Sequence, residues 1–199
     1  ADILPYFKRS ERKIGEGDDT FRGQDGNFVV TDTPWKHELC EAFIEGAVSV
    51  GIPRNPDYNG ATQDGVGYFQ RAIHKGRRMS AARAFLHPAA NRKNLQVITQ
   101  AHATRILFEE RTAVGIEYDQ GGTRKQVRAR KEVILSGGVV ASAQLLQLSG
   151  IGDPDHLGRI GIEVRHALPG VGRNLRDHYA VRMVARVENC LLYTSPSPR

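Results

Sequence analysis

The sequence has few of the residues that build metal centres. Its 199 residues include only two cysteines, Cys40 and Cys190, which lie far apart and belong to no CxxC pair. The seven histidines show no HxxxH spacing, the pattern that places two imidazoles on one helix face. We therefore expect no metal site.

Long apolar runs are also missing. No stretch approaches the roughly 20 residues that a membrane-spanning helix requires, so we expect no membrane span. The chain opens on Ala1-Asp2-Ile3 and shows no signal-peptide pattern, but its first residue is not Met, so this says little about the native N-terminus.

The usual phosphate-binding and nucleophile loops are absent. The chain contains no GxGxxG, no Walker loop and no GxSxG elbow. Two runs come near the first of these, Gly65-Val-Gly67 and Gly170-Val-Gly172, but neither has the third glycine. Neither run follows a strand and opens a clear helix, so neither predicts a dinucleotide site.

The formal charge is +6, from 28 Lys and Arg against 22 Asp and Glu. Most basic residues are scattered, and the tightest cluster, Lys75-Gly76-Arg77-Arg78, has no aromatic residues of the kind that stack on bases. The pattern favours a solvated basic surface or local anion binding, and we expect no nucleic-acid partner.

Periodicity and turn residues predict both helices and strands. Apolar spacing predicts helices over 4–11 and 34–50, and a third over 80–86 that ends at Pro88. Alternating or β-branched runs predict strands, and these cover residues 27–30, 95–99, 103–108, 113–118, 126–129 and 132–136. The order favours an α/β (α+β) fold.

The most informative local feature is the turn that follows the last of these strands. The apolar run 132–136 leads into Gly137-Gly138 and then into a helix that carries Leu145 and Leu146. In open α/β sheets ligands lie beyond the carboxyl ends of strands, where glycines let a cofactor approach the backbone. Many such turns use glycine for packing alone, so this pattern indicates only a candidate ligand site.

The last ten residues, 190–199, differ from the rest and end in a Ser-Pro repeat. They resemble the translation of an adapter used to build DNA sequencing libraries. We expect the natural sequence to end near Asn189; an ordinary Pro-rich terminus is the alternative.

One run resembles the second signature of the glucose–methanol–choline (GMC) oxidoreductases, G-A-x-x-S-P-x-L-L-x-x-S-G-I-G. It departs from that form only at Val139 and Ala143, and it spans residues 138–152. Six further runs resemble family motifs in the same order, and these lie at 4–11, 57–60, 76–86, 94–97, 113–118 and 168–178. The choline and alkanol dehydrogenase branch is the most similar.

The resemblance implies part of a Rossmann-like FAD/NAD(P)-binding domain joined to part of a substrate-binding sheet domain. It assigns 1–70 to the substrate or cap region, 71–165 to the FAD domain and 166–189 to a second substrate segment, with 190–199 as the non-native tail. It also implies that FAD lies near the backbone of Ala103, Ser136, Gly137 and Gly138.

The implied reaction is oxidation of the CH–OH group of choline or another primary alcohol, with hydride transfer to flavin N5. The resemblance does not decide whether the electron acceptor is a quinone, a dye or oxygen. It also does not decide whether the protein is located in the cytoplasm or at the membrane periphery of a bacterium. In the family the catalytic His comes from a far downstream segment, so no residue here is expected to be catalytic; Asn174, Asp177 and His178 would fix the crossing between domains.

Two alternatives remain. Some relatives keep FAD and cleave cyanohydrins, and a non-catalytic nucleotide-binding module would share the composition. Flavin bleaching by an alcohol separates an oxidoreductase from a lyase.

Overall fold

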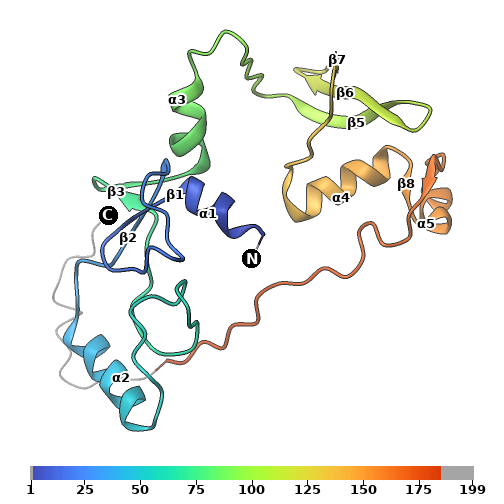
Figure 1. The fold of residues 1–199 in the computed structure, drawn as a ribbon. Helices are drawn as coiled ribbons and strands as arrows, with labels where there is room; N and C mark the ends of the chain where they lie inside the picture. Colours follow the sequence, from blue (N-terminus) through green and yellow to red (C-terminus); the bar gives the residue numbers. More distant parts are fainter. Residues whose placement is uncertain (1, 185–199) are drawn as a thin grey trace. The chain divides into compact units, whose positions relative to one another are not determined.

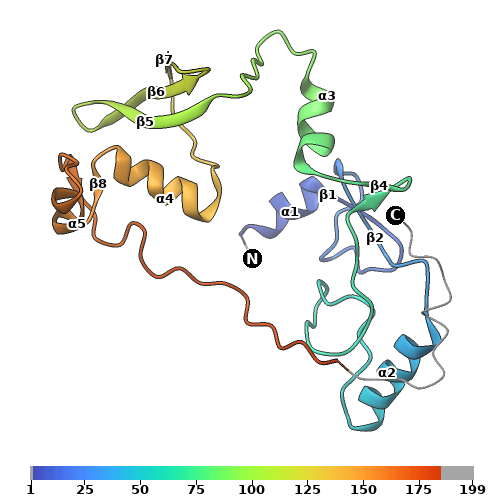
Figure 2. The same ribbon diagram turned by 180° about the vertical axis from the view of Figure 1, so that it is seen from behind.

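The computed structural model describes residues 2–184, which form two compact units (Figures 1 and 2). Unit 1 extends to Val97 and unit 2 begins at Ile98. Both contain helices and strands, which confirms the expected α/β (α+β) class. No helix within residues 2–184 is long and apolar enough to cross a membrane. The predicted domain limits at 70 and 165 stay predictions, and the expected tail, 190–199, lies outside the described residues.

Unit 1 is built from short elements around a small apolar core. The core consists of Val29, Met79 and Ala84, with Phe28 and Ala72 packed against it. Strands β1 and β2 pair in parallel, and β3 and β4 form an antiparallel hairpin. The elements of unit 1 are α1 (Leu4–Ser10), β1 (Glu11–Ile14), β2 (Phe28–Thr31), α2 (Glu38–Ser49), β3 (Ile73–His74), β4 (Arg77–Arg78), η1 (Ala82–Leu86) and α3 (His87–Ala89).

Helix α2 confirms the helix predicted over 34–50, although it begins later. The His37 Nδ1 atom accepts a hydrogen bond from the Leu39 N–H at 3.1 Å and so caps the first turn. Gly51 follows the last turn with φ +95°, a conformation that favours glycine.

The prediction that Pro88 ends the third helix is wrong. The chain makes a π-helical turn, η1, and continues directly through Pro88 into α3. The His87 N–H bonds to the Ala82 carbonyl, five residues back, which marks the wider turn. Pro88 has no N–H to donate to the turn before it, and the wider π-helical turn lies directly before it.

Unit 2 contains the longest strands, which form an antiparallel sheet in the order β5-β6-β7. This sheet confirms the strands predicted at 103–108, 113–118 and 126–129. Helix α4 packs against β5, and β8 and β9 form a short parallel pair. The elements of unit 2 are β5 (His102–Glu109), β6 (Thr112–Gln120), β7 (Thr123–Arg128), α4 (Gly138–Leu148), β8 (Ile151–Gly152), α5 (Pro154–Arg159) and β9 (His166–Ala167).

Two predicted strands, 95–99 and 132–136, are wrong for this chain, because both segments are irregular in the structure. A strand needs a neighbour that exchanges backbone hydrogen bonds with it. Within residues 2–184 neither segment has such a neighbour. Their apolar side chains stay partly in solvent, and Ile134 is 74% exposed.

Candidate functional site

Three of the four predicted cofactor residues lie around one cavity in unit 2. Ala103 on β5 forms one wall, and Ser136 with Gly137 forms the turn that opposes it, before α4 begins. The cavity has a volume of about 290 Å³. Its lining is completed by His102, Ile116, Ile134, Leu135, Ala141, Ser142, Gln144, Leu145 and Leu148. Gly138, the fourth predicted residue, is the first residue of α4 and directly follows the lining turn.

The turn itself is held by Ser142, a serine of the family-like signature to which the sequence patterns gave no role. The Gly137 N–H donates a hydrogen bond to the Ser142 Oγ at 3.1 Å, which closes the turn onto the first turns of α4. Gly138 has φ +86°, whereas a Cβ placed there would meet no atom within 4 Å. Glycine is therefore required at 138 by backbone conformation rather than by crowding, and the backbone there is open to approach by a ligand.

A second serine fastens the other end of α4 to the sheet. Ser149 is 5% exposed, and its Oγ accepts from the Ile106 N–H at 2.8 Å and donates to the Leu145 carbonyl at 2.6 Å. This contact fixes α4 against β5, the two elements that face each other across the cavity. The start of α4 is thus joined to the turn at Gly137 by an exposed hydroxyl bond, and its end is joined to β5 by a buried one.

The family-like run at 168–172 also docks on α4. The Gln147 Nε2 donates to the Val171 carbonyl at 3.1 Å, and a Cβ on Gly172 would lie 2.7 Å from that nitrogen. Gly172 also has φ +79°. Glycine at this position therefore serves a left-handed turn that packs closely on α4.

Among the acidic residues of the sheet β5-β6-β7, Glu117 on β6 has the most strongly shifted pKa. Hydrogen bonds from Arg124 and Thr104, together with the charge of Arg105, lower its pKa from 4.5 to about 2. Thr104 follows Ala103 at an irregularity in the β5–β6 register. The hydrogen bond from the Thr104 hydroxyl to the Glu117 carboxylate therefore holds β5 against β6 next to Ala103, whose backbone is predicted to contact FAD.

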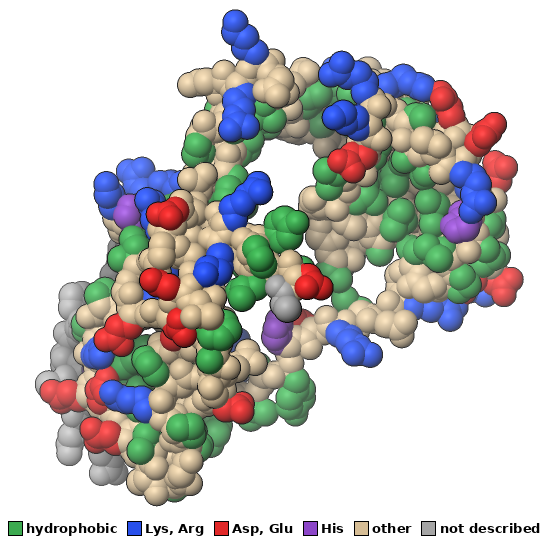
Figure 3. All heavy atoms as spheres, in the orientation of Figure 1, with side chains coloured by type: hydrophobic (Ala, Val, Ile, Leu, Met, Phe, Trp, Pro, Cys, Tyr) green, Lys and Arg blue, Asp and Glu red, His purple; other side chains and the backbone are tan. Residues whose placement is uncertain are grey.

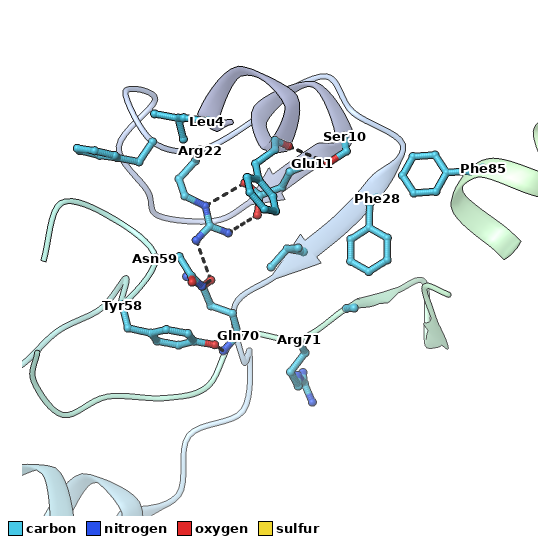
Figure 4. Close-up of a pocket in the computed structure, with 14 residues that line it drawn as sticks. Leu4, Ser10, Glu11, Arg22, Phe28, Tyr58, Asn59, Gln70, Arg71 and Phe85 are labelled. Carbon is cyan, nitrogen blue, oxygen red and sulfur yellow. Dashed lines mark hydrogen bonds and ion pairs between the residues drawn. The ribbon is translucent and has the colours of Figure 1, made fainter. Parts of the chain in front are cut away.

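Unit 1 has a larger cavity, of about 720 Å³, whose floor is a buried ion cluster (Figure 4). Arg22 is 2% exposed; its Nη2 lies 2.5 Å from Glu11 Oε1, and its Nη1 lies 2.8 Å from Asp57 Oδ1. Nη1 also donates to Gln70 Oε1 at 3.0 Å. A buried guanidinium needs such partners because an unpaired buried charge is costly.

The cluster gives the D-x-N-G motif, residues 57–60, a structural role. Asp57 Oδ1 accepts from Arg22, from the Gln70 Nε2 at 3.0 Å and from the Asn59 N–H at 3.1 Å. These bonds fold the motif's loop onto β1. Sequence reasoning missed Arg22 because nothing in a local pattern shows that Glu11 and Asp57 converge on it.

Several other residues with polar or aromatic side chains have ordinary surroundings. Gln70 is part of the ion cluster, while Phe69 is 80% exposed and packs edge-on against Tyr58 with 6.0 Å between ring centroids. The side chains of Asp177 and His178 are fully exposed and line none of the cavities described here. Among residues 2–184 no group of three or more His, Cys, Asp or Glu side chains is placed to hold a metal.

The family model for GMC oxidoreductases matches residues 1–180. The chain belongs to the GMC oxidoreductase family. It is 49% identical over 182 residues to an oxygen-dependent choline dehydrogenase of Staphylococcus saprophyticus, a match that covers 91% of this chain and 32% of that protein. The chain therefore spans about a third of the length of such relatives.

Solved structures give the same family. An FAD-dependent oxidoreductase from Chaetomium thermophilum superimposes with a TM-score of 0.82 at 30% identity, covering 88% of this chain and 33% of that one. Pyridoxine 4-oxidase from Mesorbium loti gives 0.83 at 32% identity, covering 89% and 35%. These relatives confirm that the family is FAD-dependent, as the sequence motifs indicated.

The cavity in unit 2 suits one part of FAD. Cavities that hold whole drug-sized ligands have volumes of about 300 to 1,000 Å³, so 290 Å³ accommodates a ring system rather than the whole cofactor. Its walls are largely apolar, while Ser136 and Ser142 add hydroxyl groups. The glycine backbone at 137–138 can approach a planar ring closely, so these residues fit the adenosine half.

Proposed function

We propose that this chain is part of an FAD-dependent enzyme that oxidises the CH–OH group of choline or a related small alcohol. Family membership and the 49% identity to an oxygen-dependent choline dehydrogenase support the reaction class and the substrate. The single observation that supports the role of this chain is the cavity that Ala103 shares with Ser136 and Gly137.

In this proposal the chain's own contribution is binding and positioning. The backbone of Ala103 and of Ser136, Gly137 and Gly138 holds the adenosine half of the cofactor, and the flavin, when bound, accepts a hydride from the alcohol carbon. Backbone contacts do not depend on the side chain, so the small side chain of Ala103 is compatible with this role. Ser142 closes the turn at Gly137 onto α4, and Ser149 fixes the far end of α4 to β5.

We assign no catalytic residue to this chain. The Asp177 and His178 side chains are exposed to solvent, with 3.9 Å between Asp177 Oδ1 and His178 Nδ1, and line neither of the cavities described above. The 199-residue chain alone is therefore expected to give no alcohol-dependent reduction of a dye. Molecular oxygen is the proposed electron acceptor of the complete enzyme, by analogy with the relative named above.

The test uses the complete polypeptide encoded by the gene that contains this chain. Under anaerobic conditions, choline should bleach the flavin absorbance, and admission of oxygen should restore it. A flavin that stays oxidised with choline and with other primary alcohols would refute the proposal. If cyanohydrin cleavage accompanied that result, the protein would be a lyase instead.

A further inference from the structure

Unit 2 has a second cavity, which shares no lining residue with the cavity proposed to hold FAD. Its volume is about 470 Å³, within the range of about 300 to 1,000 Å³ that is typical of small-molecule sites. Phe108 lines it from the far end of β5, and the five residue steps from Ala103 to Phe108 span about 16 Å of strand. We call it the arginine cavity, and its lining residues are Phe108, Glu110, Arg111, Ile151, Arg165 and His166.

Two separate segments of unit 2 supply the charged side chains of the arginine cavity. Glu110 and Arg111 make up the turn between β5 and β6. The N–H groups of Arg165 and His166 both donate to the Gly150 carbonyl, at 2.8 and 3.1 Å, so the backbone that carries these two side chains is held in place. Figure 3 shows basic, acidic and histidine side chains together on the edge of unit 2 where Figure 1 places β8 and the β5–β6 turn.

Arg111 and Arg165 differ from other arginines of unit 2 in their partners. Within residues 2–184, four arginines of this unit pair with carboxylates: Arg105, Arg124, Arg128 and Arg173. Arg111 and Arg165 are exposed, and neither pairs with a carboxylate of the described residues. Glu109, the acid next to the turn, is paired with Arg128. Two guanidinium groups against the single carboxylate of Glu110 therefore leave the arginine cavity with a net positive charge.

We propose that the arginine cavity binds a small organic anion, which carries a carboxylate or phosphate group on an apolar body. Guanidinium groups bind both kinds of anion through paired N–H donors, and the His166 imidazole can add another donor. Phe108 and Ile151 are half-buried, and their apolar surface suits a ring or an alkyl chain more than a bare inorganic ion. Because this cavity and the cofactor cavity share no residue, binding at one can be tested without the other.

The test is titration of the isotope-labelled 199-residue chain with phenyl phosphate and, separately, with benzoate, followed in the amide NMR spectrum. We expect saturable shifts at Arg111, Ile151 and His166 and none at Ala103 or Gly137, and the lower Kd identifies the preferred anionic group. Inorganic phosphate should bind more weakly because it lacks the ring. Benzyltrimethylammonium has a similar ring with the opposite charge, so it should not shift these signals.

Substitutions within the arginine cavity should change the affinity for phenyl phosphate in opposite directions. Arg111→Gln together with Arg165→Gln should weaken binding about 2- to 25-fold, because one exposed charge contact contributes about 1.4- to 5-fold. Glu110→Gln removes the opposing charge and should tighten binding by about 1.4- to 5-fold.

A control variant decides whether charge at this place is responsible. Arg130→Gln together with Arg159→Gln removes the same charge from exposed positions of unit 2 outside the arginine cavity, and this variant should bind nearly as well as the parent. An equal loss in the control, an unchanged affinity without the two cavity arginines, or weaker binding by Glu110→Gln would overturn the proposal. So would equal affinity for inorganic phosphate, or equal shifts with benzyltrimethylammonium.

Discussion

Replacing Ser149 with alanine should weaken the attachment of α4 to β5. In the parent, the Ser149 Oγ is the acceptor for the Ile106 N–H, and both residues are about 5% exposed. Alanine leaves that N–H buried without a partner. The Leu145 carbonyl, which the hydroxyl also contacts, keeps its bond from the Ser149 N–H at 3.1 Å. The substitution therefore leaves one buried donor, the Ile106 N–H, without its acceptor.

An unsatisfied buried donor costs about 1 to 3 kcal/mol. Since about 1.4 kcal/mol corresponds to a factor of ten, the Ile106 amide should exchange with deuterium about 5- to 150-fold faster in the variant. Amide hydrogen exchange followed by NMR measures this directly at one residue, and it does so without assuming that the two units unfold together.

Ser49→Ala is the matched control. Ser49 also lies at the end of a helix and its Oγ donates to the Gly46 carbonyl at 2.7 Å, but Ser49 is exposed. Water can replace that bond, so we expect a change within about 0.5 kcal/mol. If Ser149→Ala changed exchange at Ile106 no more than Ser49→Ala changed exchange at its own helix end, the role assigned to Ser149 would be wrong.

Three further predictions concern unit 2. The pKa of Glu117 is lowered to about 2, so its ion pairs stabilise the fold fully above about pH 4.5, and this stability is lost as the pH falls toward 2. Urea denaturation at several pH values should show that loss in the parent and not in Glu117→Gln. Asp153 caps α5 through the Asp155 and His156 N–H groups, so Asp153→Ala should cost about 1 kcal/mol and Asp153→Asn much less, as measured by thermal unfolding. Gly138→Ala forces a side chain into φ +86° and should lower stability by about 1 kcal/mol in the same assay, although no atom is crowded; an unchanged melting temperature would contradict the strain argument.

The sequence predicted those parts of the fold that depend on local information. Helix α2 and strands β5, β6 and β7 carry clear periodicity and turn residues, and they form where expected. The segments 95–99 and 132–136 have strand-like composition, but strand formation also needs a partner, which residues 2–184 do not provide.

For the candidate site, too, local motifs predicted some of the residues, whereas contacts between distant parts of the sequence were missed. Family motifs pointed to Ala103 and to the turn at 136–138, and Ala103, Ser136 and Gly137 lie around one cavity, with Gly138 directly after it. The signature contains Ser142 and Ser149, but their roles were missed, because Ser149 acts on Ile106, which lies 43 positions away. The ion cluster of Arg22 with Glu11 and Asp57 was missed for the same reason: its members come from three separate segments of the chain.

The central claim is that the backbone around Ala103 and the turn at 136–138 holds the adenosine half of FAD. Titration of the isotope-labelled chain with FAD, followed in the amide NMR spectrum, tests it most directly. We predict that the amide signals of Ala103, Gly137 and Gly138 shift, and that adenosine diphosphate shifts the same signals. Unchanged signals at these residues, or shifts confined to residues 2–97, would contradict the account.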